Sequence, residues 1–246
     1  MTNYPVPVYL TDTTSTNSYL SALCDNTKPA ELTSVYTYYQ TAGRGQRGNH
    51  WESEAGANLL FSFVMYPHFV EVSQQFLLSQ ITALSLQEIL SSYADDITIK
   101  WPNDIYWRNK KLCGTLTEID LMGAGISRCI SGTGINVNQE KFFSDAPNPV
   151  SLYQITGCRY SQPKLMHQFM ERLSAWYELL KSGDTTTIRT SYFLHLYRRE
   201  GYHSYRDENG TFQARIVDIE PIGRLMLEDT DHNIRKYMFK EVEYIL

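Results

Sequence analysis

The sequence predicts an α+β fold, in which helices flank a mixed β-sheet and a small β-barrel follows. Two observations predict this architecture. Up to about residue 198, apolar segments with helical spacing alternate with shorter β-branched and aromatic segments. Beyond that point the helical spacing ends, and four or five short strand-like segments follow, separated by turn residues such as ENG and DTDHN. We therefore expect two domains, residues 1-197 and residues 198-246.

A helix and two strands are predicted at the start of the first domain, followed by a second helix. Segment 13–23 (TTSTNSYLSAL) begins with hydroxyl residues that favour a helix N-cap, and its leucines have helical spacing. Segments 34–39 (SVYTYY) and 58–66 (NLLFSFVMY) are β-branched, aromatic or apolar, which predicts strands. Segment 73–94 repeats apolar residues at helical spacing and predicts a helix of the core.

Three more strands and two helices complete the first domain. The strands are expected at 97–101 (ITIKW), 111–121 (KLCGTLTEIDL) and 128–138 (RCISGTGINVN). A turn in WRNKK joins the segment DIY to the second of these strands, which predicts a hairpin. An amphipathic helix is expected at 163–183, ended by a glycine, and a further helix at 187–197.

Composition and charge exclude several classes of protein. The chain has 246 residues, 42% of them hydrophobic and 20% charged, as in ordinary folded globular proteins. A net charge of −5 argues against a general affinity for nucleic acid. The four cysteines stand far apart without a C-x-x-C pair, so we expect free thiols rather than disulfides or a zinc site. With no signal peptide and no membrane-spanning apolar run, the expected location is cytoplasmic.

The stretch TYYQTAGRGQRGNHW (37–51) contains the letters of a dinucleotide-binding fingerprint. Gly43, Gly45 and Gly48 spell G-x-G-x-x-G after a predicted strand. The fingerprint also requires a helix directly after the glycines and an acidic residue about 20 positions later. Segment 49–58 lacks helical periodicity, and VMYPH stands where the acid belongs. The Rossmann interpretation therefore fails.

What remains is a glycine loop that carries Arg44 and Arg47. Glycines let backbone N–H groups approach an anion, and arginine adds charge-assisted hydrogen bonds to phosphate or carboxylate. A tight, solvated turn without a ligand explains the hexapeptide about equally well. Both interpretations stay open on this segment alone.

Two further segments carry the same ambiguity. Lys100 stands at the end of a predicted strand, where it either reaches a cleft as a point charge or protects a sheet edge. Gly132 and Gly134 lie inside a predicted strand. Strand glycines weaken pairing unless another group approaches the backbone closely.

Four motifs in this order, STN (15–17), GRGQRG with Trp51, KWPND (100–104) and GTGIN (132–136), resemble those of the biotin protein ligases. KKLCGTLTE (110–118) also resembles the family's K-K-[IL]-x-G-I-L-x-E motif. The ordered set is specific, although each motif alone is weak. The terminal IRKYMFKEVEYI looks like the family's C-terminal domain, which implies an SH3-like β-barrel.

The resemblance implies a two-step reaction. The carboxylate of biotin attacks the α-phosphate of ATP in the presence of Mg²⁺, giving biotinyl-5′-AMP and pyrophosphate. A lysine of a biotin carboxyl carrier protein domain then attacks the mixed anhydride, and AMP leaves. The resemblance also implies a monomer or homodimer without membrane contact. Because the first motif begins at residue 15, it implies a monofunctional ligase that lacks the N-terminal helix-turn-helix repressor domain and does not bind DNA.

The resemblance assigns roles to residues of the motifs. Lys100 and Arg44 are the implied catalytic residues, and Lys100 is expected to bridge the biotin carboxylate and the α-phosphate. The implied biotin site consists of Ser15, Thr16, Asn17, Gln40, Arg44, Gly45, Gln46, Lys100, Gly114 and Gly132. The implied ATP site consists of Gly43, Arg47, Gly48, Trp51, Asn103, Lys111 and Asn136. No direct metal ligand is assigned, because Asp104 suits a magnesium-bound water and a plain Asn-Asp turn equally well.

One position departs from the family pattern. Gln46 stands where many members carry a second arginine that helps to retain the reactive adenylate. Glutamine keeps hydrogen bonds but lacks the charge, so looser retention is expected unless Arg47 compensates.

Two alternatives remain beside the biotin ligase. A lipoate or octanoate ligase of the same fold would keep the lysine but has no use for the polar STN segment. A non-catalytic biotin-binding protein would not need Lys100 and Arg44. A hydrolase is poorly supported, since the chain has no G-x-S-x-G motif.

Overall fold

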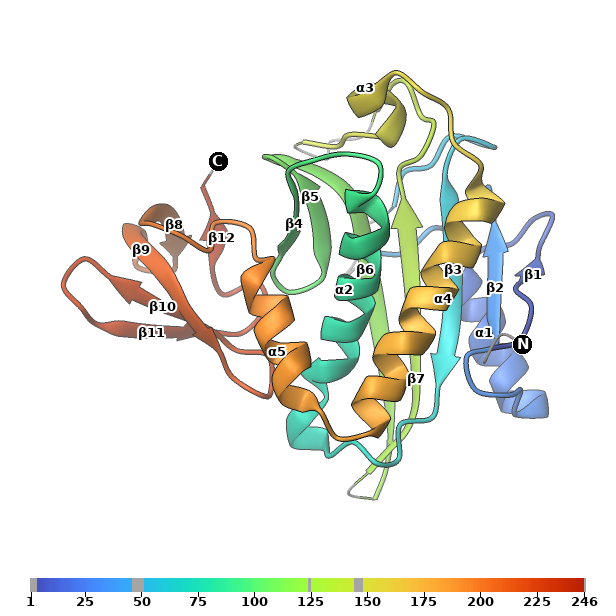
Figure 1. The fold of residues 1–246 in the computed structure, drawn as a ribbon, viewed down its shortest axis with the longest axis horizontal. Helices are drawn as coiled ribbons and strands as arrows, with labels where there is room; N and C mark the ends of the chain where they lie inside the picture. Colours follow the sequence, from blue (N-terminus) through green and yellow to red (C-terminus); the bar gives the residue numbers. More distant parts are fainter. Residues whose placement is uncertain (1–3, 46–50, 124, 144–147, 246) are drawn as a thin grey trace.

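The computed structural model of the chain describes residues 4–45, 51–123, 125–143 and 148–245. A seven-stranded mixed sheet with helices on both faces is followed by a five-stranded antiparallel sheet (Figure 1). This arrangement confirms the predicted α+β class. Gln46, Arg47 and Gly48 of the predicted site lie outside the described residues.

The elements follow the predicted order. Those of the first part are β1 (Val8–Tyr9), α1 (Thr16–Thr27), β2 (Ser34–Thr37), β3 (Leu59–Met65), η2 (Val72–Gln74), α2 (Phe76–Ser91), β4 (Ile97–Lys100), β5 (Asp104–Trp107), β6 (Lys110–Met122), β7 (Gly125–Ile135), α3 (Leu152–Thr156), α4 (Gln162–Lys181) and α5 (Thr185–Leu194). Those of the second part are β8 (His203–Asp207), β9 (Gly210–Ile219), β10 (Leu225–Asp229), β11 (Ile234–Tyr237) and β12 (Glu243–Tyr244). The expected domain boundary falls between α5 and β8.

The large sheet has the strand order β1-β2-β3-β7-β6-β5-β4. β1 pairs with β2 in parallel, and the other neighbours of the described sheet pair antiparallel. The predicted hairpin is present as β5 and β6. The backbone of Ile99 in the edge strand β4 bonds to His195 O and Tyr197 N, both at 2.8 Å, so the chain after α5 covers this edge.

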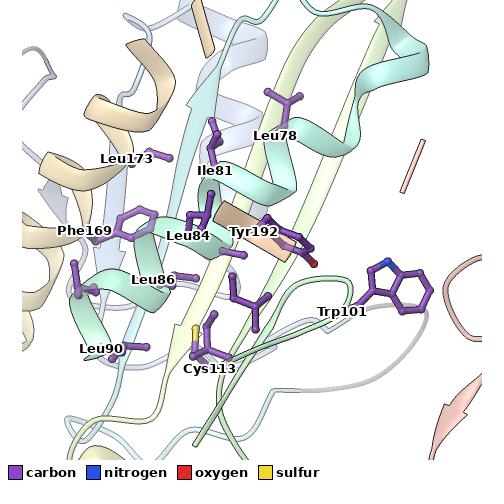
Figure 2. Packing of buried hydrophobic residues seen from close by; sticks show 14 of the residues in the cluster. Leu78, Ile81, Leu84, Leu86, Leu90, Trp101, Cys113, Phe169, Leu173 and Tyr192 are labelled. Carbon is purple, nitrogen blue, oxygen red and sulfur yellow. The ribbon is translucent and has the colours of Figure 1, made fainter. Parts of the chain in front are cut away.

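Alternation along β3 divides the core between the two faces of the sheet. Phe61 and Phe63 point towards α4, where their ring centroids lie 4.7 and 5.5 Å from that of Phe169. α2 is buried on nearly all sides because it packs between the sheet, α4 and α5 (Figure 2). On the opposite face, Val64 of β3 packs against Leu20 of α1. The face under α1 is the one that carries the site.

The second sheet has the order β11-β10-β9-β8-β12 and agrees with the small β-domain predicted after residue 198. It packs against the first part through Trp101, which follows β4. The indole Nε1 donates a hydrogen bond to Gly223 O at 2.9 Å, and the ring lies 6.2 Å from that of Phe239. The C-terminal sheet therefore contacts the segment that carries Lys100.

The structure differs from the predicted elements in a few places. β1 and α3 were not predicted, and the predicted strand 34–39 ends at Thr37. The predicted helix 73–94 begins as the short 3₁₀ turn η2 before α2 starts at Phe76. The four cysteines are free thiols, as expected. Among the described residues, no helix has the length and apolar character needed to cross a membrane.

Candidate active site

A cavity of about 700 Å³ opens on the α1 side of the large sheet. Its wall comes from the start of α1, the glycine loop, the β4–β5 turn, β6, β7 and Phe239 of the C-terminal part. The predicted site residues that line it are Ser15, Thr16, Asn17, Gln40, Arg44, Gly45, Trp51, Lys100, Asn103, Lys111, Gly114, Gly132 and Asn136. Gly43 lies beside the cavity, where its carbonyl accepts a hydrogen bond from Trp51 N at 3.1 Å.

The start of α1 forms a polar end of the cavity. Ser15 is the N-cap, yet its side chain makes no capping hydrogen bond although the residue is only 5% exposed. Gln40 Oε1 accepts hydrogen bonds from Thr16 N at 2.7 Å and Thr16 Oγ1 at 3.1 Å. The Gln40 amide nitrogen donates no hydrogen bond to any described residue. A hydroxyl and an amide are thus available to a polar ligand group.

Asn17 is fixed by contacts on both sides of its amide. Its Oδ1 lies 2.5 Å from Ser62 Oγ in β3, and its Nδ2 donates to Glu118 at 2.7 Å. The amide sits directly on Gly132 of β7: a Cβ atom there would lie 2.0 Å from Asn17 Oδ1. The close approach expected at this strand glycine is therefore that of a side chain of the same protein.

Arg44 of the glycine loop forms an ion pair with Glu118 at 3.0 Å. Both side chains are partly exposed, 46% and 40%, so this pair contributes little to stability. Glu118 also accepts the hydrogen bond from Asn17, which links the loop to the polar end. An anionic ligand can therefore compete with Glu118 for Arg44.

The Trp51 indole packs closely on two glycines of the sheet. A Cβ on Gly134 would lie 2.3 Å from the indole, and one on Gly114 would lie 3.0 Å from it. These two glycines are paired across β6 and β7. Within the described part of the chain, the buried indole Nε1 has no hydrogen-bond partner, and neither does Oδ1 of Asn136, which lines the same cavity. Buried polar atoms without partners are uncommon, and an unpaired donor and acceptor beside a cavity indicate a ligand site.

Lys111 and Asp104 form an ion pair of 2.8 Å on the cavity wall. Burial alone would lower the pKa of Lys111, but the Asp104 carboxylate outweighs it and raises the pKa above its usual value. The two charges compensate each other. Asn103 next to the pair is buried and donates to Thr115 O, which fixes the β4–β5 turn.

Lys100 is the cavity cation without an ion pair among the described residues. Its Nζ donates to Tyr106 OH at 3.2 Å and lies 5.0 Å from the ring centroid of Tyr244. Burial lowers the pKa of the ammonium below its ordinary value, Asp104 opposes the shift, and Lys111 adds to it. Lys100 therefore carries a charge that no described carboxylate neutralises at contact distance.

Among the described residues, no three His, Cys, Asp or Glu side chains converge as a metal site. Glu52 and Asp104 are carboxylates on the cavity wall. Mg²⁺ usually keeps several waters and binds through phosphate oxygens with one or two carboxylates. The donor set therefore fits an ion that arrives with a nucleotide better than one held by the protein alone.

Several residues of the site were not predicted. The sequence offered a signal for two of them. Glu118 ends the motif KKLCGTLTE, and Ser62 is a polar residue inside the apolar run NLLFSFVMY. Tyr106, Phe239 and Tyr244 had no comparable signal, because their place at the site depends on the packing of distant segments.

Comparison with known proteins shows what the chain resembles. A model of the biotin/lipoate A/B protein ligase family matches residues 9–136, which include the predicted site residues from Ser15 to Asn136. The chain belongs to this family. This membership agrees with the resemblance inferred from the motifs. By its description, the family includes ligases for both biotin and lipoate.

Relatives and solved structures agree with the family. The bifunctional ligase/repressor BirA of Bacillus spizizenii is 28% identical over 242 residues, 96% of this chain and 73% of the relative. A biotin–[acetyl-CoA-carboxylase] ligase of Paracoccus denitrificans is 28% identical over 160 residues, 62% of this chain and 66% of the relative. The biotin protein ligase of Aquifex aeolicus, solved in complex with biotin and ATP, has a TM-score of 0.81 at 23% identity and covers 98% of this chain and 100% of its own. The last similarity establishes the fold.

Proposed function

We propose that this protein is an ATP-dependent biotin–protein ligase that works through biotinyl-5′-AMP. The observation that carries the proposal is the charge of Lys100, which has no ion pair among the described residues, on the wall of a cavity that offers two chemically different kinds of contact. At the start of α1 the wall offers buried hydrogen-bonding groups, and at Trp51 it offers an indole that packs on glycines of the sheet. The similarity to named biotin ligases supports the same activity.

The polar end suits the ureido ring of biotin. This ring presents two N–H donors and a carbonyl acceptor, and Ser15 Oγ, Thr16 Oγ1 and the Gln40 amide can pair with them. Lipoate and octanoate lack such groups and would leave this buried end unsatisfied, which a polar site rejects strongly. The polar end therefore favours biotin over the other acids of the family.

The part of the wall formed by Trp51 suits the adenosine part of ATP. A purine can stack on the Trp51 indole, whose other face rests on Gly134 and Gly114. The unpaired Oδ1 of Asn136 can accept from the exocyclic amine of adenine. A Mg²⁺ ion would arrive with the phosphates, and Asp104 and Glu52 are the carboxylates of the described wall that could hold its water molecules.

Lys100 lines the same cavity, so its ammonium can contact both reactants. The carboxylate oxygen of biotin attacks the α-phosphorus, the bond to the bridging oxygen breaks, and pyrophosphate leaves with the electron pair. The ammonium reduces the repulsion between the two anions and stabilises the charge that builds on the phosphoryl oxygens. Arg44 leaves Glu118 to bind the ligand anion, and Gly45 allows the loop to approach it.

The second step transfers the biotinyl group. The neutral amine of a carrier lysine attacks the acyl carbon, the carbon–oxygen bond to AMP breaks, and the new amide loses its proton to solvent. The carrier is a biotin carboxyl carrier domain, in accord with the name of the Paracoccus relative.

Carrier modification tests the proposal. The protein is incubated with ATP, Mg²⁺, biotin and a carrier domain, and the intact mass of the carrier is measured. One added biotinyl group is expected, and a carrier whose acceptor lysine is replaced by arginine serves as the control. Modification by lipoate in place of biotin, or no modification, would contradict it.

A further inference from the structure

Two consecutive residues at the end of β4 contact the C-terminal sheet. Lys100 Nζ lies 5.0 Å from the ring centroid of Tyr244 in β12. Trp101 bonds to Gly223 O at 2.9 Å and contacts the ring of Phe239. The short sheet therefore borders the cation on which the proposed first step depends.

Two tyrosines flank the Lys100 ammonium: Tyr106, whose hydroxyl accepts a hydrogen bond from Nζ at 3.2 Å, and Tyr244. Its Nζ lies 4.9 Å from the Tyr106 centroid and 5.0 Å from the Tyr244 centroid, both within the reach of about 6 Å for a cation–π contact. Aromatic faces attract a cation without neutralising it. A carboxylate in the same place would compete with the anionic ligand, so the rings hold Lys100 and leave its charge available.

The ring of Tyr244 is itself held from two sides. Tyr205 packs edge-on with ring centroids 5.0 Å apart, and Tyr197 stacks at 6.1 Å with an interplanar angle of 29°. The hydroxyl of Tyr244 is buried and has no hydrogen-bond partner in the described part of the chain. The ring, rather than the hydroxyl, therefore makes the contact that matters for Lys100.

We propose that Tyr244 is a positioning residue for the adenylation step, and that its ring keeps the Lys100 ammonium directed into the cavity and shielded from water. The inference rests on the proposed ligase function and adds that the C-terminal sheet takes part in the first half-reaction. Tyr244 acts through Lys100 and need not touch biotin or ATP.

The test uses the complete chain and biotin-dependent exchange of pyrophosphate into ATP. Tyr244→Phe keeps the ring and should retain wild-type rates. Tyr244→Leu removes the ring and should lower kcat roughly 10-fold, with the KM for biotin changed by less than about 2-fold. Phe212→Leu is the matched control: it removes a ring that packs on Tyr205 and Tyr237 in the same sheet without contacting Lys100.

The pH profile separates positioning from a general loss of structure. Burial is the largest cause that lowers the pKa of Lys100, so water admitted in place of the Tyr244 ring should move the alkaline limb of the rate to higher pH, against the smaller effect of losing the cation–π contact. The phenol and charged groups around Lys100 are Asp104, Tyr106, Lys111, Tyr197, Arg198 and Tyr244, and all except Tyr244 remain in the variant. Phe212→Leu should leave the limb in place.

The outcomes distinguish the two proposals. If wild-type protein exchanges no pyrophosphate with biotin, the ligase proposal fails. If wild-type protein is active and Tyr244→Leu keeps its kcat and its alkaline limb, the role of Tyr244 is refuted. An equal loss in Tyr244→Leu and Phe212→Leu without a shift of the limb also refutes it. Tyr244→Met, with a flexible side chain that fills the space, replaces the leucine variant if that one does not fold.

Discussion

The Asn17 amide packs directly on Gly132, which is possible because glycine has no side chain. A Cβ atom on Gly132 would lie 2.0 Å from Asn17 Oδ1 and 3.0 Å from Ser62 Oγ. The start of α1 can therefore lie directly on β7, with the Asn17 amide between Ser62 and Glu118. The polar end of the cavity depends on this contact.

Gly132→Ala should displace Asn17 and weaken biotin binding. We expect the KM for biotin to rise by about 10-fold or more and the free energy of unfolding to fall by about 1–3 kcal/mol, as for overpacked sites. Gly125→Ala in the same strand is the control, because its nearest contact would be an ordinary 3.9 Å. Pyrophosphate exchange at varied biotin and thermal unfolding measure the two effects. Unchanged biotin dependence in Gly132→Ala would contradict this account of the polar end.

Ser15→Ala should separate ligand binding from helix capping. An N-cap serine usually contributes about 0.5–2 kcal/mol, but Ser15 makes no capping bond and should contribute little to stability. Ser161 caps α4 by accepting from Lys164 N and serves as the matched serine. We expect Ser15→Ala to raise the biotin Kd in calorimetry with little change in Tm, and Ser161→Ala to do the reverse. The same loss of Tm in both variants would assign Ser15 to capping.

The fold was largely predictable because its cores follow simple periodicities. β3 is a nearly continuous apolar run buried on both faces, and α2 repeats apolar residues at helical spacing, so both stand out in the sequence. α3 also had a signal, the capping box formed by Ser151 and Gln154, which the prediction overlooked. β1 had none, since two residues become a strand only by pairing with β2.

The site was predictable where its motifs lie close together in the sequence. The glycines of β7 indicated a close approach, but the sequence could not identify the approaching groups as Asn17 and Trp51. Glu118 contacts Asn17 from 101 positions away, and Tyr244 reaches Lys100 from another sheet. Contacts of this kind depend on tertiary packing, for which one sequence gives no local pattern.

Lys100→Met should lower the activity of the protein and raise its stability. Removal of a cation placed to stabilise charge should lower pyrophosphate exchange about 10²–10³-fold. The same change removes a partly buried charge that has no ion pair among the described residues, which should raise the Tm by about 2–4 °C, equivalent to about 1 kcal/mol. Lys110→Met, at an exposed position, should leave both quantities unchanged. A variant at Lys100 with near-normal turnover would remove the lysine from the mechanism.

The rate of pyrophosphate exchange should begin to fall at a lower pH than the ordinary pKa of a lysine would predict. The folded pKa of Lys100 is lowered by burial from its ordinary 10.5, and the proposed step needs the protonated form. Pyrophosphate exchange should therefore be fast below the lowered pKa of Lys100 and should slow as the pH rises through that pKa. In Lys100→Arg the guanidinium stays charged, so this limb should disappear from the profile of kcat/KM whatever the residual rate. An identical limb in the arginine variant would assign it to another group.

Exchange of labelled pyrophosphate into ATP, with biotin, lipoate or octanoate as the acid, tests the central claim most directly. The account predicts Mg²⁺-dependent exchange with biotin and none above background with the other two acids. Exchange with lipoate or octanoate would contradict the assignment of the polar end at Ser15 and Gln40. Binding of biotin without exchange would contradict the proposed chemistry at Lys100.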